Sequence, residues 1–304
     1  MRIFPGLAVL IVSIAAAQAQ TPQPPPPLGQ LIDVGGYRVH LYCIGEGSPA
    51  VMVVGGGFSF DWGLVQPEVA KFSKVCTYDV SGTAWSDTGP ALTCVGRVNE
   101  IHKLLSTARI KGPYVLVGLS VGALVARLYA SEYPSETAGM VIVDHAFIPT
   151  VDPPSSKSNV SSSSTRDSPP VLISKTPIVL TVEETSDFSK LPANLQQLHR
   201  WAVALKPISA TVEMADDCMA QLNAASAGPY PLGNLPLVVV STGNQARGYK
   251  ELQMGLLALS RSSRQMMADR SFHSVEIDQP EVAIGAIQEV VAVVRKSTAV
   301  RDPR

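Results

Sequence analysis

The sequence carries little charge and few aromatic side chains. Of its 304 residues, 16% are charged and 6% are aromatic, and 24 Lys and Arg against 25 Asp and Glu leave a formal net charge of −1 at pH 7. Nucleic acids and anionic membrane surfaces bind clustered excess positive charge. The balance therefore excludes nucleic acid as an expected partner and favours a small or neutral ligand.

Signatures of a bound metal or nucleotide are also missing. The four cysteines include no Cys-x-x-Cys pair, which weighs against a zinc or redox site. The triple glycine at 55–57 is not followed by Gly-Lys-Ser/Thr, so a P-loop is not expected. The run at 45–47 matches part of a dinucleotide fingerprint but leads into a predicted strand instead of a helix. We therefore expect no metal and no cofactor.

One apolar run is long enough to be a targeting segment, and it lies at the N-terminus. Arg2 precedes apolar residues 3–17, a run too short to span a bilayer, and Ala17-Gln18-Ala19 has the small-x-small pattern that signal peptidase cleaves. This pattern predicts a signal peptide at 1–19 and an exported protein, periplasmic or extracellular, without stable membrane insertion. A short membrane anchor is the alternative.

Export changes what the four cysteines imply, because oxidising compartments allow disulfides. Cys43 and Cys76 each lie in a strand-like run, and they can pair if those strands are neighbours. Cys94 and Cys218 would then form the second bridge. Four cysteines allow three pairings, among which the sequence does not choose.

The remaining sequence alternates short apolar runs with helical patterns. Strands are expected within 31–43 and at 50–54, 74–79, 114–119, 139–144, 235–241 and 272–277, and helices at 62–72, 95–108, 121–133 and 280–294. Such alternation predicts βαβ units, and therefore an α/β fold whose mainly parallel sheet is covered by helices on both faces.

The alternation lapses in a Ser-rich linker followed by a helical pattern at 191–224, which we interpret as a cap. The predicted organisation is a signal peptide at 1–19, a proline-rich segment at 20–30, a core at 31–147 and 235–297, a cap at 148–234 and a tail at 298–304. Substrate choice is expected to depend on the cap. Its larger apolar side chains either line a pocket or, as we favour, pack the lid: Trp201, Leu205, Met214 and Met219.

The strongest chemical signal is the Gly-x-Ser-x-Gly motif centred on Ser120, between a predicted strand and a predicted helix. A nucleophile on such a sharp turn needs small residues two positions to either side. A serine also needs a base, and histidine is the usual one at neutral pH. Of the five histidines, His273 is the candidate that lies near the C-terminus, after the last long apolar elements and shortly before the closing helix. For the Gly-x-Ser-x-Gly motif, the alternative interpretation is an ordinary glycine-rich turn between a strand and a helix.

Acyl transfer further requires two backbone N–H groups that face the developing oxyanion. One is expected from Val121, at a helix N-terminus where unpaired N–H groups favour an anion. The other is expected from the triple-glycine loop, where Gly56 is favoured and Gly57 is next.

These motifs resemble those of the α/β-hydrolase superfamily. The similarity is carried by VVGGGFSFDW, YDVSGTAWSD, GPYVLVGLSVGALVARLYA, MVIVD and SFHSVEIDQPE. The resemblance implies an eight-stranded, mostly parallel sheet, a lid after the sixth strand, and cofactor-free hydrolysis of an ester, amide, lactone or similar bond. It also implies the chain order serine, acid, histidine.

Three positions depart from that superfamily. Val54 and Leu119 stand where histidine is common, although neither change removes a backbone donor or the nucleophile. The acid usually follows the seventh strand, but the run Ser-Thr-Gly-Asn-Gln-Ala-Arg at 241–247 contains no carboxylate. Asp144, after the sixth strand, is our replacement, because some haloalkane dehalogenases place their acid there. Glu251 is the second candidate for the acid. The alternative interpretation of Asp144 is a structural aspartate that caps the loop after the strand.

Together these features predict an exported serine hydrolase, most simply of carboxylic esters, with a small ester-like substrate. Ser120 is the nucleophile, His273 the base and Asp144 the acid. An aminopeptidase or a cofactor-free haloperoxidase would share this triad, and a non-catalytic binding protein would keep only the fold. Epoxide hydrolase and dehalogenase chemistries are disfavoured because they require an aspartate in place of Ser120.

Overall fold

A computed structural model describes residues 24–90, 93–145, 187–205, 211–225, 229–243 and 249–301 of the chain. The predicted signal peptide at 1–19 and the Ser-rich linker lie outside these ranges. Within them, every helix is too short or too polar to cross a bilayer. Export and the domain boundaries therefore stay predictions.

The described residues form one eight-stranded sheet with the order β1-β2-β4-β3-β5-β6-β7-β8. The strands are β1 Gln30–Asp33, β2 Arg38–Ile44, β3 Ala50–Val54, β4 Val75–Tyr78, β5 Tyr114–Leu119, β6 Thr137–Val143, β7 Leu237–Thr242 and β8 Ser263–Ala268. Among these strands, β2 pairs antiparallel with β1 and with β4, and the other five pairs are parallel. The predicted mostly parallel, eight-stranded sheet is confirmed.

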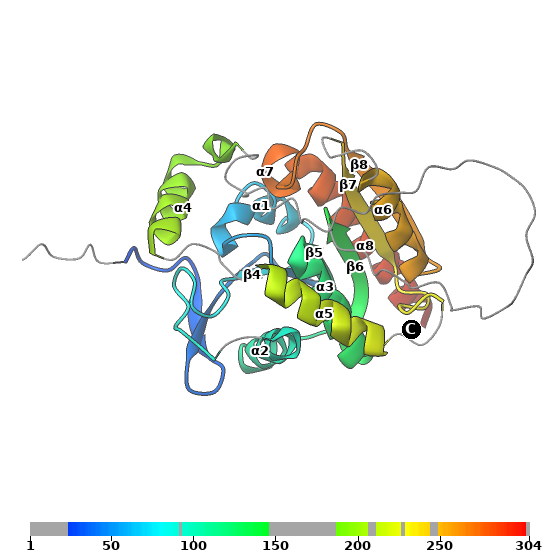
Figure 1. Ribbon diagram of the computed structural model, residues 1–304, viewed down its shortest axis with the longest axis horizontal. Coiled ribbons are helices and arrows are strands. Elements are labelled where there is room, and N and C mark those ends of the chain that lie inside the picture. The colour runs from blue at the N-terminus through cyan, green and yellow to red at the C-terminus, as the bar shows by residue number, and fades with distance from the viewer. Residues whose placement is uncertain are drawn as a thin grey trace, which may run out of the picture.

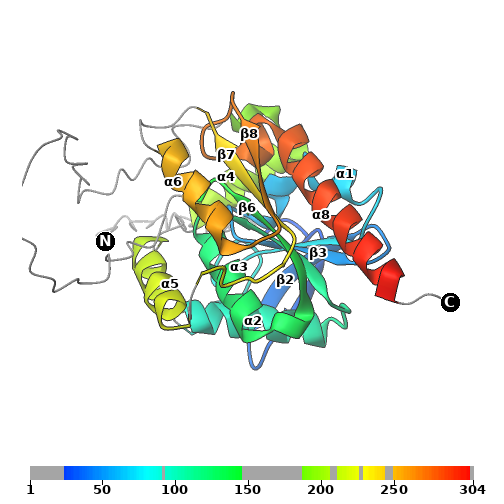
Figure 2. The ribbon, with the colours of Figure 1, turned by 90° about the vertical axis from the view of Figure 1, so that its right-hand side faces the viewer.

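Helices cover both faces of the sheet (Figures 1 and 2). The longer helices are α2 Cys94–Thr107, α3 Val121–Glu132, α4 Ala193–Leu205, α5 Thr211–Ala225 and α8 Pro280–Arg301, and the shorter ones are α1 Gln66–Val69, α6 Tyr249–Gly255 and α7 Val275–Asp278. Single 3₁₀ turns are η1 Ser59–Trp62, η2 Pro134–Glu136, η4 Phe188–Lys190 and η5 Leu256–Leu259. One apolar core lies between the sheet and α2, α3 and α5, and a second lies between the sheet and α1 and α8. The continuous apolar runs of β3 and β5 are buried throughout, as strands covered on both faces require.

Two predicted elements differ from the structure. The strand expected at 272–277 is wrong, because the eighth strand is β8 and α7 occupies the end of that segment. β8 is an edge strand of sequence SRQMMA whose residues are mostly half-buried, so it lacks the continuous apolar run of the central strands. The helix expected at 62–72 is broken into η1 and the single turn of α1.

The insertion between β6 and β7 contributes two described helices that pack in different places. α4 lies over η1, and its Trp201 contacts Trp85 with the two rings tilted and their centroids 5.3 Å apart. α5 lies along α2 and α3 (Figure 1). Its Met214 and Met219 pack against the apolar core beneath. Trp201, Met214 and Met219 therefore pack against apolar neighbours, whereas Leu205 is exposed.

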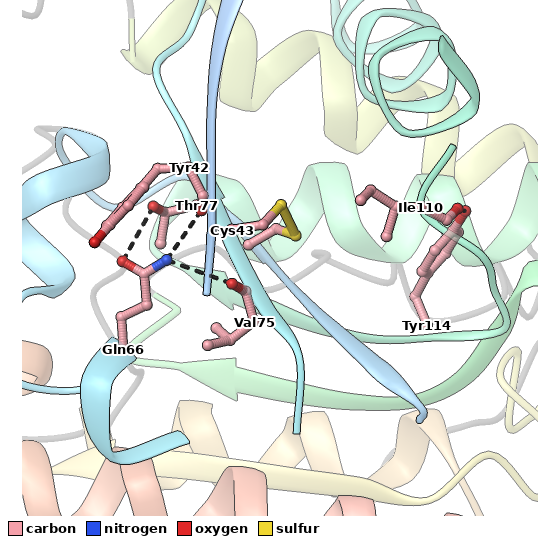
Figure 3. Close-up of a disulfide and its surroundings, with 8 residues drawn as sticks. Tyr42, Cys43, Gln66, Val75, Thr77, Ile110 and Tyr114 are labelled. Atoms are coloured by element: carbon pink, nitrogen blue, oxygen red, sulfur yellow. Dashed lines mark hydrogen bonds between the residues drawn. A yellow bond between two sulfur atoms is a disulfide. The ribbon is translucent and has the colours of Figure 1, made fainter. Parts of the chain in front are cut away.

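Two disulfides join elements that are distant in sequence. Cys43 and Cys76 are directly opposite one another on the antiparallel strands β2 and β4. Beside this bridge, the Gln66 side-chain amide donates to the carbonyl oxygens of Tyr42 and Val75 (Figure 3). The second bridge joins Cys94 of α2 to Cys218 of α5. The pairing expected for neighbouring strands is confirmed.

The turn from β5 into α3 is closely packed against the end of β3. Ser120 at the turn has φ 55° and ψ −127°, a strained conformation for a residue with a side chain. A Cβ atom on Gly122 would overlap the carbonyl oxygen of Val54, and one on Gly118 would lie 2.5 Å from the Cα of Ala123. Glycine is therefore required on both sides of Ser120 because the backbone segments touch.

Removal of the Cys94–Cys218 disulfide should destabilise the protein more than removal of the Cys43–Cys76 disulfide. The Cys94–Cys218 bridge spans 124 residues and the Cys43–Cys76 bridge spans 33. Loop-closure entropy grows with the length of the closed loop, so the double variant Cys94→Ala/Cys218→Ala should lose about 1 kcal/mol more unfolding free energy than Cys43→Ala/Cys76→Ala. Urea titration of both double variants measures this difference, and a larger loss from the shorter loop would contradict the argument.

The substitution Gly122→Ala should lower the unfolding free energy by about 2 kcal/mol, because the new methyl group must displace the end of β3. Gly255→Ala is the matched control, since Gly255 has φ −58° and open space around its Cα. The control should stay within about 1 kcal/mol of the wild type. Equal stability of the two variants in a thermal melt would show that the close contact at Gly122 has no energetic importance.

Candidate active site

Ser120 and Asp144 stand at adjacent strand ends. The N–H of Ser120 donates to the carbonyl oxygen of Val143 over 3.1 Å, and the N–H of Asp144 donates to the carbonyl oxygen of Val240 over 2.9 Å. Asp144 has a positive φ of 38°, so the chain turns sharply as it leaves β6. Both side chains therefore lie at the carboxyl edge of the sheet, where open α/β sheets bind their ligands.

His273 reaches Asp144 from the segment between β8 and α7. Nδ1 of His273 lies 2.6 Å from Oδ2 of Asp144. The Asp144 side chain is fully buried, whereas the imidazole is 24% exposed. The structure thus brings together the predicted acid and base. Glu251, the reserve acid, belongs to α6, and its side chain lies outside the described part of the structure.

The other oxygen of Asp144 is held by two side chains that sequence analysis missed. Oδ1 accepts hydrogen bonds from Oγ1 of Thr242 at 2.8 Å and Nε2 of Gln253 at 2.6 Å. The Tyr249 hydroxyl also bonds to Asp144, and burial together with this negative charge raises the pKa of Tyr249. Such donors are what a buried carboxylate requires. The sequence feature that could have revealed one of these partners is Thr242, a polar residue directly at the end of an apolar strand.

The two residues predicted to supply the oxyanion donors are Gly56, in the triple-glycine loop, and Val121, the first residue of α3. In the described part of the chain, no acceptor is found for the N–H of Gly56 or of Val121. Gly55 packs against the helix start, since its Cβ would lie 2.8 Å from the Cα of Gly122. Gly56 has φ 84°, and its Cβ would lie 2.5 Å from the Leu119 side chain. The triple-glycine loop is therefore fixed against the residues that precede and follow Ser120.

A second buried carboxylate ties this loop to α4. Oδ2 of Asp61 accepts the N–H of Phe58 at 2.8 Å, and Oδ1 lies 2.8 Å from Nδ1 of His199. Burial raises the pKa of Asp61, and the His199 contact opposes that rise. The His199 ring also stacks on Phe188 with centroids 4.0 Å apart. His199 lies in the segment predicted as the cap, and no sequence pattern indicated this contact.

Another buried histidine is fully occupied by structural bonds. Nδ1 of His40 lies 2.8 Å from Oδ2 of Asp79, and its Nε2 accepts the N–H of Gly29 at 2.9 Å. Oδ1 of Asp79 in turn accepts the N–H of Ser59 at 2.7 Å. Because both ring nitrogens are bonded, His40 anchors β1, β2 and η1 instead of serving as a base.

Glu276 adds a buried acid close to the site. It lies in α7, three residues after His273, and its side chain is fully buried. Burial raises the pKa of Glu276 well above its usual value, and the nearby charges of Asp61 and Asp144 raise it further. These effects favour the protonated, neutral form of Glu276, which limits the negative charge around Asp144.

Comparisons with known proteins point to one family. The alpha/beta hydrolase fold family matches residues 49–163. The uncharacterized protein YqjL of Bacillus subtilis is 26% identical over 256 residues, which cover 81% of this chain and 85% of that protein. The 2-hydroxymuconate semialdehyde hydrolase of Pseudomonas sp. is 31% identical over 132 residues, covering 41% of this chain and only 46% of that enzyme.

A solved structure shares the architecture. The thermophilic esterase from Thermogutta terrifontis superposes with a TM-score of 0.61 at 20% identity, covering 85% of this chain and 94% of the esterase. At that identity the likeness shows the fold alone. The sheet order, the tight turn at Ser120 and the family match agree with one another. The chain has the α/β-hydrolase fold and belongs to the α/β-hydrolase superfamily.

Proposed function

We propose that this hydrolase is an exported serine hydrolase that cleaves carboxylic esters through an acyl-enzyme on Ser120. The observation that carries the proposal is the 2.6 Å contact between His273 and the buried Asp144, beside the strand end that bears Ser120. Asp144 holds the proton of the neutral imidazole on Nδ1, so Nε2 has a free lone pair. That nitrogen is the one that takes the proton of an attacking serine.

The proposed reaction has two halves. Ser120 Oγ attacks the ester carbonyl while His273 accepts its proton, and the N–H groups of Gly56 and Val121 stabilise the oxyanion. His273 then returns the proton to the leaving alcohol. Water, deprotonated by the same histidine, releases the acid from Ser120. No step requires a metal or a cofactor.

Several observations support this proposal over its alternatives. A non-catalytic binding protein has no need for the strained backbone at Ser120 or for two unused N–H donors beside it. The two disulfides support export, because such bonds persist in oxidising compartments. Aminopeptidase and haloperoxidase activities use the same three residues, so a substrate assay separates them from ester hydrolysis.

A fluorophosphonate probe tests the nucleophile. The protein comprising residues 20–304 should be labelled, and Ser120→Ala should abolish labelling. Ser106→Ala, in the exposed face of α2, is the matched control and should label as the wild type does. Absence of labelling in the wild type, or unchanged labelling of Ser120→Ala, would refute the serine mechanism. A series of para-nitrophenyl esters from acetate to palmitate then tests the ester substrate and its acyl length.

Replacement of Asp144 by Asn should lower kcat by roughly 10³ to 10⁴, with a small effect on KM. The amide keeps the size of the side chain, but it neither fixes the productive histidine tautomer nor stabilises the imidazolium. Steady-state kinetics on the preferred ester measures the loss. Glu251→Gln is the control and should keep near-wild-type kcat. The opposite result would identify Glu251 as the acid.

A further inference from the structure

A cavity lies away from Ser120, between α3, the end of α5 and the segment before β7. It has a volume of about 190 Å³ and is lined by Arg127, Ser131, Leu222, Ala225, Tyr230, Pro231 and Leu232. Arg127 follows Ser120 by seven residues along α3, which places it about 10 Å further along the helix axis. The cavity therefore belongs to the far part of α3, outside the proposed catalytic machinery.

Arg127 places a buried positive charge at this cavity, and no carboxylate among the described residues pairs with it. Arg127 is only 3% exposed, and among the described residues its guanidinium makes no hydrogen bond or ion pair. Burial lowers the pKa of Arg127 to about 10, so the guanidinium remains charged at neutral pH. An unpaired buried guanidinium is costly, and a bound anion would remove that cost.

The wall opposite α3 has a defined and strained conformation. Tyr230 adopts φ 62°, in the left-handed region that side chains seldom occupy. The guanidinium of Arg261 lies over the Tyr230 ring, 4.8 Å from its centroid, and holds it by a cation–π contact. Strain of this kind is often found at binding sites, where the surrounding structure maintains it.

The lining selects among anions. Leu222, Ala225, Pro231 and Leu232 present apolar surface, while the planar guanidinium matches the two oxygens of a carboxylate. A phosphate would need donors on several sides. The volume equals that of about six liquid water molecules, which accommodates an acid with a chain of a few carbons. We propose that this cavity binds a short-chain carboxylate, with Arg127 as its charged partner.

Thermal melts of the intact protein with sodium butyrate test this site. At butyrate a hundred times its Kd, the wild-type Tm should rise by about 5 °C. Arg127→Met removes the charge and should lose the rise. Ala225→Phe fills the cavity while Arg127 remains, and should also lose it. If butyrate bound near Ser120 instead, it would still stabilise both variants. Both variants should hydrolyse esters as the wild type does, because neither residue belongs to the proposed catalytic site.

Butyramide, sodium chloride and sodium phosphate at matched ionic strength complete the experiment. The proposal requires that none of them reproduces the butyrate effect. It is overturned by an equal rise with butyramide, by a larger rise with phosphate or chloride, by retention of the rise in both variants, or by no rise in the wild type. Ala225→Phe keeps the test valid if Arg127→Met does not fold.

Discussion

The buried Asp144 carboxylate joins four parts of the chain that are far apart in sequence. Asp144 directly follows β6, Thr242 ends β7, Gln253 lies on α6 and His273 precedes α7. A fully buried charge is tolerated only when donors surround it, so these segments must assemble in one arrangement. The same bonds that satisfy Asp144 also fix the orientation of the His273 ring, so folding and the proposed catalysis share one constraint.

The packing of β3 against the start of α3 is a second constraint on the same edge. Glycine at 118 and 122 lets the turn at Ser120 lie against the triple-glycine loop without side chains between them. Asp61 then links this loop to His199 of α4. α4 is therefore anchored to the loop that carries a proposed oxyanion donor. A substitution that moves α4 is therefore expected to shift the position of that N–H donor through the Asp61 contacts.

Sequence patterns predicted the central strands well because β3 and β5 are continuous apolar runs covered on both faces. They failed at β8, an edge strand of mixed polarity, and misplaced the eighth strand next to His273. The Asp144 hypothesis came from a resemblance, and its contact with His273 needed the structure. Gln253, Thr242 and Asp61 were missed because their partners lie far away along the chain, and no local spacing records such contacts.

The two disulfides follow one another along the chain and do not interleave: the first closes at Cys76, before the second opens at Cys94. For a chain that leaves the cytoplasm from its N-terminus, the cysteines emerge in the order in which they pair. An oxidase that joins consecutive cysteines as they appear thus forms both native bridges directly. For the proposed exported protein, maturation would then require oxidation alone, without a disulfide isomerase.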